Sequence, residues 1–210
     1  MDFPFLIGFS GKKNAGKSTL SRFLQEELRK CDISSRVIGF GYPLKMTVHR
    51  LFGVPIELLF GSYENKLEPT DLYWEDMPVY GGHITKSGRM SVRDLLQHFG
   101  TDIGRQMYKN VWCNALYNEI LTLDPMPVIL FIDDVRFVNE CEWVKDKHGK
   151  VVRLTRVIDS SDMHESETAL DYYDDFSLII NNHYLSLEDT KVVAERIILG
   201  KWIETYINLV

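Results

Sequence analysis

Short apolar runs alternate with amphipathic stretches along this chain of 210 residues. The apolar runs hold few polar positions, which is typical of strands in a parallel sheet that is covered on both faces. They are residues 5–9, 36–40, 128–132, 151–157 and 177–180. Between them, apolar positions recur at helical spacing at 18–30, 43–52, 91–109, 139–147 and from 186 onward. The alternation predicts an α/β fold, with a five-stranded parallel sheet flanked by helices.

Residues that start and stop helices agree with these boundaries. Pro43 suits the first position of a helix, whereas Gly53 and Gly149 suit the position just after one. Two Ser-x-x-Asp motifs, at 91–94 and 186–189, resemble capping boxes with a shorter acid. They predict helix starts at both places.

Residues 61–90 lack this periodicity, because glycines and prolines are scattered there among aromatic and charged residues. We expect a long surface excursion, and two roles for it are open, a cover over a substrate or plain decoration. A chain of 210 residues can bury a sizeable core as one domain.

The segment Gly11-Lys12-Lys13-Asn14-Ala15-Gly16-Lys17-Ser18 has the pattern of a phosphate-binding loop between a strand and a helix. Backbone N–H groups of such a loop converge on phosphates, Lys17 can reach the β- and γ-phosphoryl oxygens, and the Ser18 hydroxyl can bind Mg²⁺. The helix start adds the positive end of its dipole. A glycine-rich turn that binds nothing is the alternative. The residues expected at a nucleoside triphosphate are Gly11, Asn14, Ala15, Gly16, Lys17, Ser18 and Thr19.

Asp133 and Asp134 directly follow the apolar run at 128–132. Carboxylates at the C-terminal end of a parallel strand face the crevice where ligands bind, so they can hold Mg²⁺ beside the loop. A helix cap or a turn is the alternative for such an acid. We favour Ser18 and Asp133 as metal ligands, and the choice between the two acids stays open.

A second polar set follows these acids. Arg136 precedes Glu140 by four residues, which is one helical turn, and Asn139 lies beside Glu140. A guanidinium close to carboxylates could bridge a phosphate while an acid binds a sugar hydroxyl or a base edge. An ion pair on a solvated helix face is the alternative.

A third set lies in the predicted helix at 91–109, where Arg93, Gln97 and Thr101 share one polar face. Arg suits a phosphate, Gln suits the hydrogen-bonding edge of a base, and Thr suits either. The set fits a nucleoside monophosphate, although the solvated side of a helix can look the same.

Charge and cysteine content narrow the class of protein. The net charge of −6 gives no electrostatic footprint for nucleic-acid binding. Three widely spaced cysteines argue against a disulfide framework and a zinc site, which suits a reducing cytoplasm. No apolar run approaches the length that a membrane span needs, so we expect a soluble, untargeted chain. A homodimer stays open.

These motifs together resemble those of the deoxynucleoside monophosphate kinases of tailed bacteriophages. The match runs in order across most of the chain, and the motifs at 93–101 and 134–140 are its specific part. The matching segments are Gly11 to Ser18, Pro43-Leu44-Lys45, Arg93-x-x-x-Gln97-x-x-Gly100-Thr101 with Arg105 and Trp112, Asp134-Val135-Arg136-Phe137-x-Asn139-Glu140, His164-x-Ser166-Glu167, and Ile179-Ile180-Asn181-Asn182.

The resemblance implies a kinase that moves the γ-phosphoryl group of ATP, with Mg²⁺, to a deoxynucleoside 5′-monophosphate. If the chain is phage-encoded, it would act in the cytoplasm of the infected cell and supply DNA precursors. The implied catalytic residues are Lys17, Arg105, Asp134 and Arg136. The implied contacts to the monophosphate are Lys45, Arg93, Gln97, Gly100, Thr101, Trp112, Asp134, Arg136, Asn139 and Glu140.

The family fold implied is a single P-loop kinase domain, similar to nucleoside monophosphate kinases, over 1–210. We expect a substrate-covering insertion around 54–112 and a lid around 157–175, with lid cations from Arg153, from Arg156 or from the stretch near His164. Gly41-Tyr42 replaces the expected Ala-Asp, and Val138 replaces a proline, so the base that is accepted stays open.

Rival functions share the phosphate-binding loop. Dephospho-coenzyme A kinase or another small-molecule P-loop kinase would keep the fold and change the acceptor. A nucleotide-binding switch of the GTPase kind is disfavoured, because the sequence has no Asn-Lys-x-Asp guanine motif. A scaffold that binds ATP only for stability would leave the Arg93 and Arg136 sets unexplained.

Overall fold

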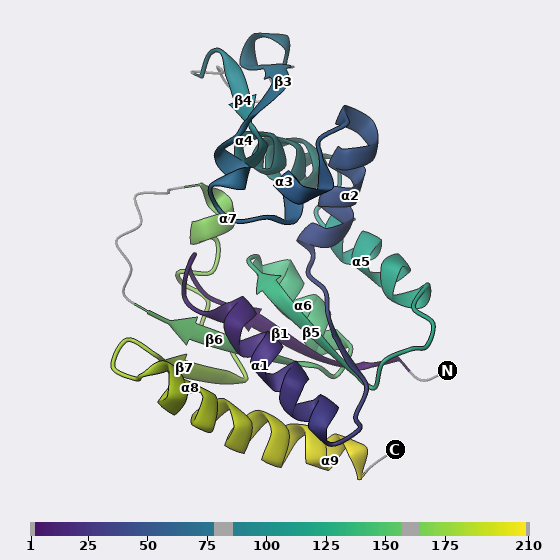
Figure 1. Ribbon diagram of the computed structural model, residues 1–210, viewed down its shortest axis with the longest axis vertical. Coiled ribbons are helices and arrows are strands. Elements are labelled where there is room, and N and C mark those ends of the chain that lie inside the picture. The colour runs from purple at the N-terminus through teal and green to yellow at the C-terminus, as the bar shows by residue number, and fades with distance from the viewer. Residues whose placement is uncertain (1–2, 78–85, 157–163, 209–210) are drawn as a thin grey trace. The chain divides into compact units, whose positions relative to one another are not determined.

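The computed structural model describes residues 3–77, 86–156 and 164–208 (Figure 1). It divides the chain into two compact units, one formed by Met1–Phe40 with Tyr117–Val210 and the other by Gly41–Leu116. We call them the sheet unit and the inserted unit. Part of the predicted lid at 157–175 and residues 78–85 of the predicted excursion lie outside the described residues.

The sheet unit is built on a five-stranded parallel sheet with the strand order β2-β5-β1-β6-β7 (Figure 1). Its strands fall at the five apolar runs of the sequence, which confirms the predicted sheet. Because β1 lies in the middle, its C-terminal end is flanked by β5 and β6, and this edge is where such sheets bind ligands. The strands are β1 (Phe5–Ser10), β2 (Ser35–Val37), β5 (Ile129–Val135), β6 (Lys150–Thr155) and β7 (Leu178–Asn181).

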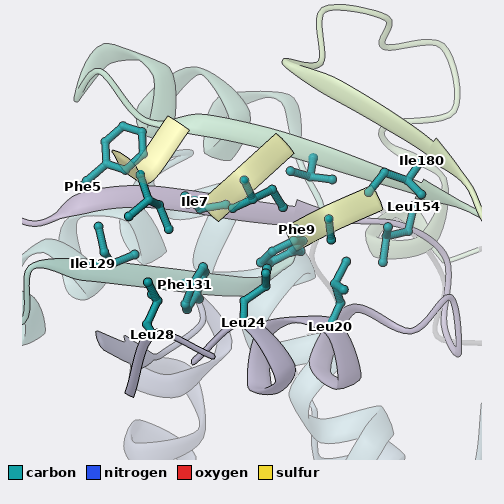
Figure 2. Close-up of a cluster of buried hydrophobic side chains, with 14 of the residues drawn as sticks. Phe5, Ile7, Phe9, Leu20, Leu24, Leu28, Ile129, Phe131, Leu154 and Ile180 are labelled. Carbon is teal, nitrogen blue, oxygen red and sulfur yellow. The ribbon is translucent and has the colours of Figure 1, made fainter. Parts of the chain in front are cut away.

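Helices cover both faces of this sheet. On one face, α1 and the C-terminal helical segment pack against Phe5, Ile7 and Phe9 of β1 (Figure 2). On the other face, Val144 of α6 lies beside Leu6. Successive residues of β1 thus face different helices, which explains why every position of this strand is buried. The helices are α1 (Lys17–Lys30), α6 (Val138–Asp146), α7 (Glu165–Thr168), α8 (Leu187–Ala194), η4 (Glu195–Ile203) and α9 (Glu204–Ile207).

Three of the predicted helix boundaries are confirmed. Ser91 Oγ accepts the Asp94 N–H at 3.0 Å, and the Asp94 carboxylate accepts the Ser91 N–H at 3.2 Å, which completes a capping box. Ser186 Oγ accepts the Asp189 N–H at 3.0 Å at the start of α8. Gly53 follows α2 (Gly41–Phe52) with a φ of 68°, a conformation that glycine adopts without strain.

Two other boundary predictions are wrong in detail. The left-handed residue after α6 is His148, with a φ of 58°, rather than Gly149. Gly149 is constrained differently, since a Cβ there would lie 2.7 Å from the Leu6 carbonyl oxygen. Pro43 is the third residue of α2 rather than the first. Its missing N–H still falls among the groups that a helix start leaves unpaired.

The inserted unit combines helices with a two-stranded antiparallel sheet of β3 (Pro69–Tyr73) and β4 (Arg89–Ser91). Trp74 and Met90 are buried in a hydrophobic cluster with Leu95. The predicted structureless excursion at 61–90 is therefore wrong for the described part of that segment. The remaining elements before residue 92 are α3 (Ile56–Phe60), η1 (Asn65–Leu67) and η2 (Trp74–Asp76), and α5 (Val111–Leu121) comes later.

The helix predicted at 91–109 consists of two elements. α4 (Val92–Gln97) continues as η3 (His98–Arg105), which is a π-helix. Such segments are rare and occur frequently at functional sites. A Cβ at Gly100 would lie 2.6 Å from Leu44 Cδ2, so η3 packs closely against α2 there.

Candidate active site

The phosphate-binding loop follows β1 and leads directly into α1. Gly11 is required by a close approach, because a Cβ there would lie 2.7 Å from the Leu154 carbonyl oxygen. Gly16 precedes α1 with a φ of 94°, which disfavours other residues. The Lys17 ammonium donates to the carbonyls of Gly11 at 2.7 Å and Lys12 at 2.8 Å. The loop therefore curls around its own lysine, whose ammonium is held by two backbone carbonyls of the loop.

Lys17 is an unusual lysine, since only 8% of its surface is exposed. Burial, and next the positive charge of Arg136, lower its pKa to about 8, although the carboxylates of Glu167, Asp134 and Asp133 oppose the shift. Two cations thus lie in one partly desolvated region. An anionic ligand that contacts both cations would favour their charged forms.

The Ser18 hydroxyl donates to Asp133 Oδ2 at 2.7 Å. This contact joins the start of α1 to the C-terminal end of β5. A hydroxyl and a carboxylate oxygen are ligands that Mg²⁺ accepts, and nucleotide phosphates and water can complete its octahedral coordination. The donor set therefore fits Mg²⁺, and Ser18 and Asp133 are the two residues that would hold it.

Asp134 makes a different contact from its neighbour, as expected for successive residues of a strand. Its Oδ1 accepts the backbone N–H of Phe40 at 2.7 Å, just after β2. Gly39 leaves room for this carboxylate, because a Cβ there would lie 2.4 Å from its atoms. The geometry thus separates the two acids, with Asp133 at the phosphate-binding loop and Asp134 at the end of the 38–40 segment.

Arg136 contacts a buried acid. Its Nη1 donates to Glu167 Oε1 and to the Ser166 carbonyl oxygen, the latter at 3.3 Å. Burial opposes the charged form of Arg136, but the carboxylates of Glu167, Asp134 and Glu140 outweigh it, so its pKa is raised above the ordinary value. A permanently charged guanidinium with part of its surface exposed suits phosphate binding.

Glu140 and Asn139 belong to the start of α6 and are both buried. Glu140 Oε2 accepts the backbone N–H groups of Arg136 at 2.7 Å and Phe137 at 3.1 Å. A solvated helix face, the alternative interpretation of the Arg136 set, does not describe an acid that is 1% exposed. Glu140 therefore shapes the turn that presents Arg136, whatever else it contacts.

A pocket of about 440 Å³ adjoins the phosphate-binding loop within the sheet unit. Asn182, which follows β7, donates from Nδ2 to the Ala15 carbonyl at 2.8 Å. Its Oδ1 is buried and has no hydrogen-bond partner among the described residues. The pocket extends from the loop along this asparagine. Other lining residues are Asn14, Thr19, Arg156, Leu185, Leu187 and Thr190.

The inserted unit carries the other predicted substrate residues. The guanidinium of Arg93 lies over the Tyr63 ring, and the ammonium of Lys45 lies over the Phe60 ring. Gln97 Nε2 is buried and has no hydrogen-bond partner in the described part of the chain.

Within η3 and the segment after it, the predicted residues make local contacts. Trp112 Nε1 donates to the Gly100 carbonyl oxygen at 2.7 Å, which ties α5 to η3. Thr101 is 7% exposed, and Arg105 donates to the Lys109 carbonyl oxygen. Lys45, Arg93, Gln97, Gly100, Thr101, Arg105 and Trp112 thus belong to one compact unit, and Asp134, Arg136, Asn139 and Glu140 to the other.

Two residues at the loop had no assigned role from sequence, Glu167 and Asn182. Both lie more than 150 positions from the backbone atoms that they contact. The His-x-Ser-Glu and Asn-Asn segments of the resemblance were the signals that could have marked them, but neither segment indicated a partner.

The described residues include no helix that is long and apolar enough to cross a membrane.

A family model and one viral relative point to the same family. A family model described as deoxynucleotide monophosphate kinase matches residues 78–192. The "Putative deoxynucleotide monophosphate kinase" of Acanthamoeba polyphaga mimivirus is 28% identical over 190 residues, which cover 85% of this chain and 88% of that protein. "Uncharacterized protein ORF77" of Ictalurid herpesvirus 1 (strain Auburn) is 35% identical over 107 residues, 48% of this chain and 46% of that protein.

Among solved structures, TT1252 from Thermus thermophilus is similar in fold, with a TM-score of 0.50 at 15% identity. The similarity covers 96% of this chain and 99% of that one. The fold predicted from the sequence, a P-loop kinase with a parallel sheet flanked by helices, is confirmed. A bacteriophage source stays a prediction.

Proposed function

We propose that this chain, which belongs to the deoxynucleotide monophosphate kinase family, moves the γ-phosphoryl group of ATP to the 5′-phosphate of a deoxynucleoside monophosphate. An oxygen of the acceptor phosphate attacks the γ-phosphorus, the bond to the β,γ-bridging oxygen breaks, and ADP and a deoxynucleoside diphosphate leave. The observation that carries the proposal is the convergence of Lys17, the Ser18–Asp133 pair and Arg136 at one end of the sheet. Such a reaction would supply precursors for DNA synthesis.

The donor half of the site is the phosphate-binding loop with the adjoining pocket. Backbone N–H groups of residues 11–18 bind the triphosphate, and Lys17 neutralises charge on the β- and γ-phosphoryl oxygens. Mg²⁺ held by Ser18 and Asp133 would neutralise the same oxygens further. The pocket takes the nucleoside, where Asn182 Oδ1 offers an acceptor to an amino group of the base.

We propose two sets of acceptor-binding residues, one set in each unit. Arg136 binds the transferred phosphoryl group, and Asp134 orients the substrate beside it. From the inserted unit, Arg93 binds the acceptor phosphate, Gln97 reads the base edge, and Trp112 walls the base pocket. A buried amide nitrogen of Gln97 without a partner among the described residues supports a role in binding polar ligand atoms. Lys45, Gly100, Thr101, Asn139 and Glu140 complete this set.

We also propose that residues 54–112 form the substrate-covering part of one kinase domain and that a lid lies around 157–175. Phosphoryl transfer needs exclusion of water, because water would otherwise accept the phosphoryl group. Arg105 contributes a cation to the closed site.

The test is whether ADP formation depends on the acceptor. Purified protein with Mg·ATP is expected to release ADP only when a deoxynucleoside monophosphate is added. The screen includes the four common monophosphates, a modified pyrimidine monophosphate and dephospho-coenzyme A. Equal ADP release with and without an acceptor would contradict the proposal. Activity with dephospho-coenzyme A and with no deoxynucleoside monophosphate would instead identify the chain as a dephospho-coenzyme A kinase.

A further inference from the structure

Glu167 is a buried acid that the proposed mechanism does not use. Among the described residues, the buried acids are Glu140 and Glu167, and the Glu167 side chain is only 3% exposed. A buried carboxylate is costly unless cations or N–H groups surround it. Its position on α7 is therefore best explained by the groups that it contacts.

The two oxygens of this carboxylate contact different segments. Oε1 accepts from Nη1 of Arg136, which follows β5. Oε2 accepts the backbone N–H of Lys13, in the phosphate-binding loop, at 3.3 Å. One short side chain thus joins the loop that would hold the donor phosphates to the guanidinium that would meet the transferred group.

The backbone around Glu167 strengthens the same connection. The Lys12 ammonium donates to the Glu167 carbonyl oxygen at 2.7 Å and forms an ion pair with Asp171. Arg136 also donates to the Ser166 carbonyl oxygen. Residues 166–171 therefore bind both partners through backbone and side chain, which restricts independent motion of the loop and of Arg136.

We propose that Glu167 is a positioning residue that holds Arg136 at the phosphate-binding loop in the geometry required for phosphoryl transfer. The inference rests on the proposed function and adds to it a role for a residue that is not among the proposed nucleotide contacts. A guanidinium misplaced by about 1 Å can cost two orders of magnitude in rate, so a residue that fixes it matters for turnover.

The charges of the site support this role. Burial, and next the positive charge of Arg136, lower the pKa of Lys17, and the Glu167 carboxylate opposes the effect of the Arg136 charge. Without a carboxylate between the loop and Arg136, the guanidinium would tend to move toward solvent, where 31% of its side chain already lies. Glu167 thus keeps two like charges close together before any phosphate arrives.

A competing role predicts a different result. The Glu167 carboxylate accepts an N–H group of a loop that binds anions, so it could act as a phosphate substitute that ATP must displace. Removing its charge would then tighten ATP binding and lower KM for ATP. A positioning role instead lowers kcat and leaves KM for ATP nearly unchanged.

The experiment compares Glu167→Gln and Glu167→Asp with Glu165→Gln, an exposed control in the same short helix. We expect Glu167→Gln to lower kcat at least tenfold, with KM for ATP within threefold of wild type. Glu167→Asp keeps the negative charge but shortens the side chain, so its kcat should fall between those of wild type and Glu167→Gln. Glu165→Gln should match wild type.

A second arm combines Glu167→Gln with Arg136→Ala. If Glu167 acts through Arg136, the double variant will have the kcat of Arg136→Ala alone; an additional tenfold loss would overturn the inference. If Glu167→Gln does not fold, Glu167→Asp decides, and a kcat within twofold of wild type overturns the inference. A tenfold lower KM for ATP in either variant would favour the phosphate-substitute role instead.

Failure of the inference differs from failure of the proposed function. Active wild type and Glu165→Gln with an equally active, folded Glu167→Gln would overturn the positioning role alone. A wild-type protein that releases no ADP with any deoxynucleoside monophosphate would overturn the function and the inference together.

Discussion

The close approach of Gly39 to Asp134 leads to a sharp prediction for Gly39→Ala. The backbone of Gly39 does not need a positive φ, so alanine is allowed there conformationally. Its Cβ, however, would lie 2.4 Å from the carboxylate atoms of Asp134. The carboxylate has to move, and it then loses the Phe40 N–H that it accepts at 2.7 Å.

The cost follows from that lost hydrogen bond. A hydrogen bond to a charged group contributes roughly 1.5–3 kcal/mol. Replacing glycine by alanine returns about 0.4–1 kcal/mol by restricting the unfolded chain. We therefore expect Gly39→Ala to lower the free energy of unfolding by about 1–2 kcal/mol. For a chain of this size, that corresponds to a melting temperature lower by roughly 2–8 °C.

Thermal or urea unfolding followed by circular dichroism measures this change. Gly200→Ala is the control, because its Cβ would meet its nearest atom, the Glu195 carbonyl oxygen, at 4.0 Å. That variant should be as stable as wild type or slightly more stable. In an Asp134→Ala background, Gly39→Ala should cost nothing, since the clashing group is gone. An equal loss in both backgrounds, or none in either, would refute the steric argument.

Three further predictions concern the site and its surroundings. Arg136→Ala should lower turnover well over tenfold in a folded protein, since loss of one charge-stabilising donor costs about 3 kcal/mol in the transition state. Unchanged turnover would show that Arg136 does not belong to the active site. Ser18→Ala or Asp133→Ala should raise the Mg²⁺ concentration for half-maximal activity about tenfold, because each variant deletes an oxygen ligand. An unchanged Mg²⁺ requirement in both variants would argue against Ser18 and Asp133 as the metal ligands. At pH 8, iodoacetamide should modify exposed Cys31 and spare Cys141, because burial raises the pKa of the Cys141 thiol to about 12; peptide mass mapping that shows equal labelling would contradict this.

Much of the sheet unit could be predicted because its signals are local. A parallel strand covered on both faces is apolar throughout, and the 5–9 run shows this without reference to any partner. The phosphate-binding loop is likewise recognisable from eight consecutive residues. Ser91 and Ser186 mark helix starts through acids three positions away.

The inserted unit was harder to predict because its contacts are not local. β3 and β4 pair across about 20 positions with an irregular register, so neither strand shows a clean alternation. The π-helical turn of η3 has the same apolar spacing as an ordinary helix at this length. The sequence suggested that Gly149 ends a helix, whereas in the structure the Leu6 carbonyl oxygen of β1 leaves no room for a Cβ at this position.

In the site, too, residues with local sequence signals could be predicted, and residues that depend on distant contacts could not. Lys17 and Ser18 follow from a motif, and the alternation along β5 separates Asp133 from Asp134 once their partners are known. Glu167 depends on Lys13 and Arg136, which lie 154 and 31 positions away. Such a contact follows from topology, which brings the end of β5 and the segment before β7 to the same edge of the sheet.

The most direct test of the central claim follows the phosphoryl group itself. Protein is incubated with Mg²⁺, a deoxynucleoside monophosphate and ATP that carries ¹⁸O in the γ-phosphoryl group, and the products are resolved by mass spectrometry. We expect the label in the β-phosphoryl group of a deoxynucleoside diphosphate, in equal amount to the ADP formed. Label that appears only in inorganic phosphate, with the monophosphate unchanged, would contradict the assignment as a deoxynucleoside monophosphate kinase.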